Sequence, residues 1–213
     1  MVQNLNGRSK SPNQEQRELE RRLSILRAAA RVFRETGAYF NGHFALTSGL
    51  HSSEYLQCAL VLQHPQHAEA LGRSLGDQVR DLRATVVLSP ALGGIVIGHE
   101  VARALGVRAM FAERQDGALT LRRGFIIAEN DRVLVVEDVL TTGGSTKETI
   151  QVARAAGGQV VGAAAIVNRG APRFDVPFVA LLQMQLPTYE PDQCPLCAQG
   201  LPVVKPGSRP VAT

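Results

Sequence analysis

Short apolar runs alternate with helical patterns between residues 85 and 167, and this alternation constrains the fold more than any other feature. Runs rich in β-branched residues that alternate with helices are typical of parallel strands joined by crossover helices. The sequence therefore predicts an α/β domain in which helices flank a central parallel β-sheet. Strands are expected over 85–88, 107–111, 132–136 and 160–167, and helices over 67–82, 94–105 and 145–156.

The segments on either side of this core differ from it in composition. Residues 1–13 are polar and are expected to form a disordered basic leader, and apolar residues at helical spacing predict a helix over 14–35. Residues 38–62 alternate and contain glycine and serine, which predicts short strands and turns. The proline-rich residues 187–213 are expected to form an extended tail, which leaves 14–186 as the domain.

The net charge of +4 is concentrated at one end of the chain. Residues 1–31 carry seven basic and three acidic side chains, so the rest of the chain holds 16 of each sign. This distribution favours a solvated leader and first helix over a nucleic-acid-binding arm. No apolar run approaches the roughly 18 residues that span a bilayer, and the first residues lack a signal-peptide pattern. We therefore expect a cytoplasmic protein without membrane contact.

The segment EDVLTTGGST, which begins at Glu137, holds the strongest functional signal. Glu137 and Asp138 follow an apolar run, and a helix is expected to begin near Ser145. Ligands of open parallel sheets bind at the carboxyl ends of the strands, and the free N–H groups of a helix start attract anions. The glycines and hydroxyls of 141–146 therefore suit a phosphate, whereas the two acids suit neutral hydroxyls beside it. A ribose 5-phosphate satisfies both demands.

Two other phosphate-binding patterns are missing from the sequence. A P-loop requires GxxxxGK[ST], and none of the three lysines, Lys10, Lys147 and Lys205, follows a glycine in that pattern. A dinucleotide-binding fold requires GxGxxG after an early strand, and SPALGGIVIG at 89–98 has the wrong spacing. These absences leave the sugar-phosphate interpretation in place.

The stretch 133–145 resembles the signature by which type I phosphoribosyltransferases bind 5-phosphoribosyl pyrophosphate (PRPP). The similarity extends over roughly residues 36–207. FALTSGLHSSEYLQC at 44–58 resembles the base-binding segment of orotate phosphoribosyltransferases. SPALGG at 89–94 resembles the loop that binds pyrophosphate in these enzymes, and IVNR at 166–169 resembles a strand of theirs that ends in an arginine. The family implies a type I phosphoribosyltransferase-like fold, usually dimeric. Its small hood subdomain would be formed here by about 38–62 and the C-terminal part.

The resemblance also implies a role for each residue of the site. The catalytic residues would be Glu137, Asp138 and Arg114. Orotate would contact Thr141, Arg169 and Tyr55, and Mg²⁺ would be held mainly through PRPP, without direct protein ligands. PRPP would be bound by the consecutive residues Glu137, Asp138, Val139, Leu140, Thr141, Thr142, Gly143, Gly144 and Ser145.

The chain lacks several basic side chains that the family commonly carries in its loops. Residues 113–125 are expected to form either a plain hairpin or a mobile lid, and 111–124 lack the lysines and histidine that the family commonly carries there. Arg114 is the candidate for a lid cation that reaches pyrophosphate, in its own site or in that of a neighbouring subunit. Thr47 and Gly93 also stand where relatives often have a lysine.

The implied reaction transfers the phosphoribosyl group of PRPP to orotate, giving orotidine 5'-phosphate and pyrophosphate in pyrimidine biosynthesis. The substrates would be two small molecules, and the partner a second copy of the chain. Two alternatives stay open: a phosphoribosyltransferase for another base, and a PRPP-sensing regulator of the same fold that binds nucleic acid.

The three cysteines divide into an isolated Cys58 and the pair Cys194 and Cys197 in a CPLC motif. CxxC is half of a zinc site, but a tetrahedral site needs four ligands, and no second CxxC is present. The pattern favours structural cysteines most. A redox pair or a zinc site shared across a dimer is the second choice, and a zinc site within one chain is the last.

Overall fold

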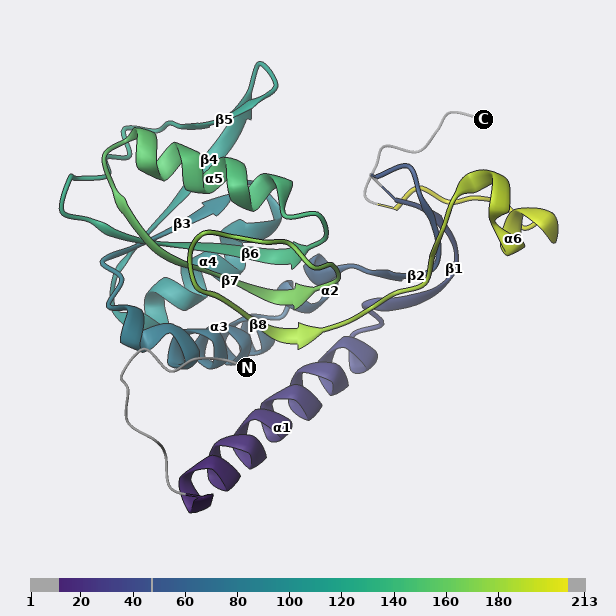
Figure 1. Cartoon of the computed structure of the whole chain (residues 1–213), viewed down its shortest axis with the longest axis horizontal. Helices are drawn as coiled ribbons and strands as arrows, with labels where there is room; N and C mark the ends of the chain where they lie inside the picture. Colours follow the sequence, from purple (N-terminus) through teal and green to yellow (C-terminus); the bar gives the residue numbers. More distant parts are fainter. Residues whose placement is uncertain (1–11, 47, 207–213) are drawn as a thin grey trace.

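The computed structural model describes residues 12–46 and 48–206, and two β-sheets organise them (Figure 1). The larger sheet has the strand order β5-β4-β3-β6-β7-β8, in which β5 is antiparallel to β4 and all other pairs are parallel. Its strands are β3 (Val86–Pro90), β4 (Arg108–Gln115), β5 (Ala118–Leu121), β6 (Arg132–Leu140), β7 (Gln159–Asn168) and β8 (Phe178–Gln183).

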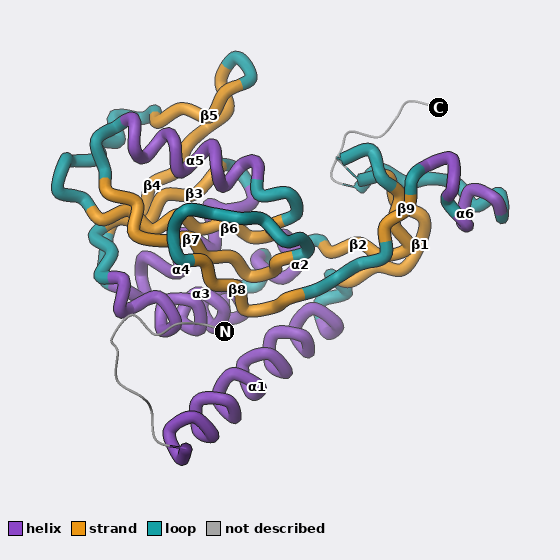
Figure 2. Tube along the Cα trace, viewed as in Figure 1, coloured by secondary structure: helices purple, strands orange, loops and turns teal. Residues whose placement is uncertain are grey.

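Helices cover both faces of this sheet, which gives three layers (Figure 2). The face covered by α5 (Gly144–Ala155) contains Val133 and Val135, and the opposite face contains Leu134 and Val136. Successive side chains of a strand point to opposite faces, so a strand buried on both sides must be apolar throughout. The second face is covered by α1 (Pro12–Glu35), α2 (Cys58–Leu62), α3 (Pro65–Val79) with the 3-10 turn η1 (Arg80–Leu82), and α4 (Gly93–Leu105).

Glycines let α4 approach its neighbours closely. A Cβ atom added at Gly98 would collide with the Ser89 side chain of β3, and one added at Gly72 of α3 would lie 2.8 Å from the backbone carbon of Glu100. Gly106 ends α4 in the left-handed conformation, with φ of 73°. These contacts fix where α4 begins, directly behind the carboxyl end of β3.

A second, smaller sheet forms the hood. It has the order β1-β2-β9, with β1 (Tyr39–Ala45), β2 (His51–Leu56) and β9 (Thr188–Tyr189) all antiparallel. The chain then forms the 3-10 turn η2 (Pro191–Gln193) and α6 (Pro195–Ala198). Farther on, Val204 returns to β1, where its N–H donates to the carbonyl of His43 at 2.8 Å. The hood therefore joins segments from the two ends of the described chain (Figure 1).

The expected strands and helices of residues 85–167 are all present, with boundaries shifted by at most four residues. The structure resolves the 113–125 alternative in part, because 108–121 forms the β4–β5 hairpin with a turn at Asp116 and Gly117. Two expectations are wrong. Cys58–Leu62 is helical instead of extended, and Phe178–Gln183 is a strand that was not expected. Residues 1–11, which make up most of the expected leader, lie outside the described residues.

No helix within the described ranges is long and apolar enough to cross a membrane.

Candidate active site

The site begins with the acidic pair at the carboxyl end of β6. Glu137 and Asp138 were expected to follow the strand, but β6 continues to Leu140, because Val139 and Leu140 still pair with β7. The strand conformation therefore includes both acids. Glu137 is buried, with 8% of its surface exposed, and Asp138 is half-buried.

Burial and the adjacent Asp138 carboxylate raise the pKa of Glu137 to about 9. Glu137 is therefore protonated at neutral pH, and its hydroxyl can donate a hydrogen bond while its other oxygen accepts one. One carboxylate oxygen of Asp138 accepts the N–H of Val139 at 2.8 Å. A Cβ atom at Gly93 would lie 2.8 Å from that oxygen, so the glycine at this position leaves room for the Asp138 carboxylate.

The loop after β6 leads directly into the N-terminus of α5. Gly143 has φ of 77°, and an added Cβ would lie 2.8 Å from Pro172, so only glycine fits this position without strain. The N–H of Lys147 donates to the Gly143 carbonyl at 2.9 Å and closes the first helical turn. The free N–H groups and the positive end of the helix dipole therefore face the loop and favour an anion there.

Arg169 lies at the end of the neighbouring strand, β7. Its backbone N–H donates to the Leu140 carbonyl at 2.7 Å, which holds it beside the acidic strand. Its Nε atom is buried, and none of the described residues accepts a hydrogen bond from it. Burial lowers the pKa of Arg169 and raises that of Tyr55, and each group also acts electrostatically on the other. A half-buried guanidinium with a buried, unpaired Nε donor is suited to a planar anionic ligand.

One cavity of about 610 Å³ brings these groups together. Its lining includes all nine residues predicted to bind PRPP, Glu137 to Ser145, together with Tyr55 and Arg169. The residues assigned to the sugar phosphate and to the base therefore face the same space.

Arg114 does not take part in this arrangement. Arg114 is not among the lining residues, and its guanidinium pairs with Glu148 of α5 at 2.8 Å. Glu148 also accepts the N–H of Leu119 at 2.6 Å and so holds the hairpin against α5. The lid role of Arg114 stays a prediction, and Thr47 lies outside the described residues.

The cavity also contains residues that the sequence analysis did not assign to it. Lys205 and Pro206 line it from the C-terminal segment, and Leu186 and Thr188 line it from the approach to the hood. The KPGSR stretch that contains Lys205 resembles the tail of some orotate phosphoribosyltransferases, but the sequence analysis gave Lys205 no role in the site. Lys205 supplies an ammonium group on the hood side, in a chain that lacks the usual loop lysines.

A model of the phosphoribosyl transferase domain matches residues 60–186, so the fold and the site together define a phosphoribosyltransferase. The chain is 53% identical to the orotate phosphoribosyltransferase of Pelotomaculum thermopropionicum over 182 residues, which are 84% of this chain and 96% of that protein. It is 51% identical to the orotate phosphoribosyltransferase of Caldanaerobacter subterraneus over 180 residues, 84% of this chain and 95% of that one. The chain belongs to the orotate phosphoribosyltransferase family.

Solved structures have the same fold. The orotate phosphoribosyltransferase of Aeropyrum pernix superposes with a TM-score of 0.62 at 28% identity, covering 73% of this chain and 93% of that one. The Mycobacterium tuberculosis orotate phosphoribosyltransferase in complex with PRPP superposes with a TM-score of 0.58 at 22% identity, covering 76% and 95%.

Proposed function

We propose that the cavity at the ends of β6 and β7 carries out the reaction of the family, the transfer of a phosphoribosyl group from PRPP to orotate. The products are orotidine 5'-phosphate and pyrophosphate. The observation that carries the proposal is the convergence on one cavity of three features: an acidic pair, a glycine loop at a helix start, and a half-buried arginine whose buried Nε donor has no partner among the described residues.

PRPP binds along the β6–α5 junction. The loop residues 141–145 receive the 5-phosphate, because glycine backbone, hydroxyls and helix dipole all favour an anion there. Glu137 and Asp138 contact the ribose 2- and 3-hydroxyls. The raised pKa of Glu137 lets it donate to one hydroxyl oxygen, whereas the Asp138 carboxylate accepts from a hydroxyl proton.

Orotate binds at the other end of the cavity. Arg169 pairs with orotate oxygens through its guanidinium, which matches a carboxylate or two carbonyl groups bidentately. The Tyr55 ring lies against the base, and Thr141 contacts both substrates. Orotate reaches the site with its negative charge, so the protein mainly positions the reactants and stabilises charge that develops at the ribose C1 atom.

Mg²⁺ fits this site through the substrate. The Asp138 carboxylate lines the same cavity, and carboxylate and phosphate oxygens are the donors that Mg²⁺ prefers. Bound mainly to PRPP oxygens, the ion would neutralise charge on the departing pyrophosphate. Asp138 and the loop hydroxyls orient the ribose, and Lys205 supplies a positive charge on the same cavity wall.

Two further features belong to the proposal. The β4–β5 hairpin, with Arg114, closes over a site and excludes water from it. The chain acts as a cytoplasmic homodimer, and an exposed row of leucines on α1, Leu19, Leu23 and Leu26, supports a contact between copies.

A base screen tests the reaction. Purified protein is mixed with PRPP, Mg²⁺ and one base at a time, and pyrophosphate release is measured. Release with orotate and not with adenine, guanine or uracil is expected. Release with a purine alone, or with no base, contradicts the proposal. RNA or DNA binding that disappears when residues 1–31 are deleted, in a protein without transferase activity, favours the regulator.

Substitution of Arg169 tests the base-binding role. Arg169→Ala should lower kcat/KM for orotate about a hundredfold or more, because a charged bidentate contact is worth roughly 3 kcal/mol. The exposed Arg173→Ala, four residues away, removes the same side chain outside the cavity and should leave kcat/KM unchanged. Equal losses in the two variants contradict the assignment.

A further inference from the structure

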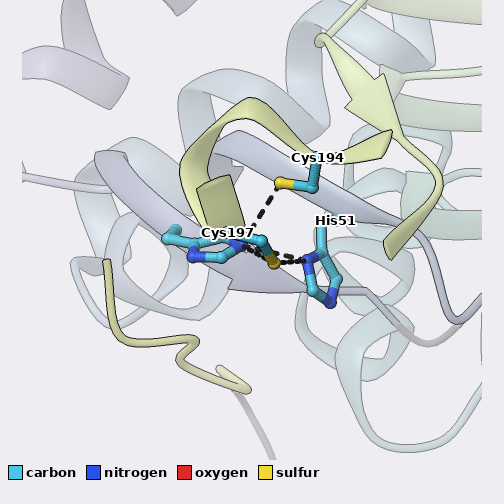
Figure 3. Close-up of side chains that lie close together, drawn as sticks. His51, Cys194 and Cys197 are labelled. Atoms are coloured by element: carbon cyan, nitrogen blue, oxygen red, sulfur yellow. Dashed lines mark hydrogen bonds between the residues drawn. The ribbon is translucent and has the colours of Figure 1, made fainter. Parts of the chain in front are cut away.

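Four potential metal ligands meet in the hood, away from the residues that bind PRPP in the proposal. They are His43 of β1, His51 of β2, Cys194, which directly precedes α6, and Cys197, which lies in α6. One ligand atom from each lies within 4.8 Å of all the others. Figure 3 shows the side chains of His51, Cys194 and Cys197 converging from the hairpin and from the C-terminal segment.

The spacing of these atoms is close to that of a tetrahedral site. A zinc ion bound at about 2.3 Å by sulfur and about 2.0 Å by nitrogen separates its ligand atoms by roughly 3.3–3.8 Å. Nε2 of His43 lies 3.4 Å from Sγ of Cys194, 3.7 Å from Sγ of Cys197 and 2.9 Å from Nδ1 of His51. The remaining close distance, between Sγ of Cys197 and Nδ1 of His51, is 3.3 Å. Small side-chain rotations bring all four around one ion.

A backbone contact orients the most buried histidine. Nδ1 of His43 lies 2.8 Å from the carbonyl oxygen of Leu201, which can only accept a hydrogen bond. Nδ1 therefore carries the proton, and Nε2 points its lone pair at the cluster. Zinc-binding histidines characteristically donate their other ring N–H to a carbonyl or carboxylate in this way.

The chemistry of the four groups selects the ion. Two thiolates and two neutral imidazoles balance the charge of a divalent cation, and soft sulfur ligands favour zinc over Mg²⁺ or Ca²⁺. His43 and Cys194 are buried, with 4% and 3% of their surfaces exposed, whereas Cys197 is exposed. The ion would thus be shielded on one side and reachable from solvent on the other.

We propose that His43, His51, Cys194 and Cys197 bind one Zn²⁺ ion in a structural site. Four protein ligands leave no open position for substrate, so the ion has no part in catalysis. It ties the β1–β2 hairpin to a segment about 150 residues later in the chain, beside the native contacts of Val204 with β1. Lys205 and Pro206 directly follow Val204 and line the active-site cavity. The ion therefore stabilises one wall of that cavity.

Metal content tests the proposal without reference to activity. The full chain is purified from zinc-supplemented medium and dialysed against a mild chelator, and zinc is then measured by mass spectrometry. About one zinc per chain is expected. Replacement of zinc by Co²⁺ should produce intense visible bands of tetrahedral cobalt together with thiolate-to-cobalt charge transfer.

Matched variants locate the ion. Cys197→Ser and His43→Asn should each lower the retained zinc at least tenfold, because each removes one of four ligands. Cys58→Ala and His99→Asn remove the same residue types outside the cluster and should keep about one zinc per chain. Loss of zinc in the controls as well contradicts the assignment.

A thiol count separates zinc from a Cys194–Cys197 disulfide. In denaturant with chelator but without reductant, the protein as isolated should show all three of its cysteines as thiols. A count of one thiol identifies a disulfide and overturns the proposal, as does a zinc-free wild-type protein that gives no cobalt spectrum. Removal of the zinc by a chelator should also lower Tm by on the order of 5 °C. This measurement uses the wild-type protein, so it does not depend on the folding of any variant.

Discussion

At the scale of single residues, Glu137 is a buried acid in a cavity that is otherwise built to receive charge. Its pKa of about 9 means that the folded protein keeps a proton that the unfolded chain loses above the ordinary value of 4.5. Between these two values the folded state binds more protons than the unfolded state, so the free energy of unfolding falls as pH rises.

Glu137→Gln tests this linkage, because glutamine resembles the protonated acid and does not titrate. Relative to wild type, the variant should gain about 2–4 kcal/mol of unfolding free energy between about pH 5 and pH 8, since each unit of pKa shift is worth about 1.4 kcal/mol. Urea unfolding at several pH values measures the gain. The exposed Glu129→Gln is the matched control, and a difference that is flat with pH would contradict the buried-proton account.

Candidate site residues that are neighbours in the sequence are the ones that sequence analysis can group together. Glu137, Asp138 and the glycine loop lie within ten consecutive residues, and all of them line the cavity. Lys205 and the partners of the CPLC motif could not be found in this way. His43 meets Cys194 across 151 positions, and no periodicity or spacing reports a contact that the hood sheet creates. The sequence pattern favours structural cysteines because no second CxxC is present in the chain.

At the scale of elements, α3 and α4 pack at a distance that depends on two glycines of α3. A Cβ atom at Gly72 would collide with the side chain and backbone of Glu100, whereas one at Gly76 would lie 3.0 Å from the Ala104 side chain. Both glycines lie on α3 and face α4, but the space for an added methyl group is smaller at Gly72 than at Gly76.

We expect Gly72→Ala to lower the free energy of unfolding by about 1–2 kcal/mol, because the clash exceeds the helix preference gained from alanine. Gly76→Ala should change it by less than about 0.5 kcal/mol, because these two effects nearly cancel. Urea unfolding compares the two variants. A larger loss at Gly76 than at Gly72 would contradict the packing argument.

Element types were predictable wherever pattern and length agreed. The apolar β-branched strand around Val133–Val136 and the helix that ends before Gly106 were both expected. Cys58–Leu62 was mistaken for extended chain because a five-residue apolar run carries no period that separates helix from strand. The strand Phe178–Gln183 was missed because the surrounding prolines suggested irregular chain.

At the scale of the whole molecule, α1 extends away from the sheet at its N-terminal end (Figure 1). Leu19, Leu23 and Leu26 recur at a spacing that places them on one side of the helix, and they are 52%, 43% and 44% exposed. A second copy of the chain in the proposed homodimer would cover this row.

The double substitution Leu23→Glu and Leu26→Glu should shift the protein from dimer to monomer in sedimentation velocity, because it places charges in an apolar contact. Ile126→Glu, at a position 72% exposed outside α1, is the control and should stay dimeric. A monomeric wild type would contradict the proposed dimer. A double variant that stays dimeric would show that the dimer contact does not involve this row of leucines.

The pairing of early and late segments in the hood has a consequence for synthesis on the ribosome. The hydroxyl of Ser52 donates to the carbonyl of Pro187, a partner translated 135 residues later. At about 5–20 residues per second, the β1–β2 hairpin waits roughly 7–27 s with an open edge before β9 can pair with it. Unpaired strand edges invite association with other chains. The edge of the hairpin therefore stays open while the strands of the parallel sheet, Val86 to Gln183, are being synthesised, and we expect association between nascent chains to be most frequent during that interval.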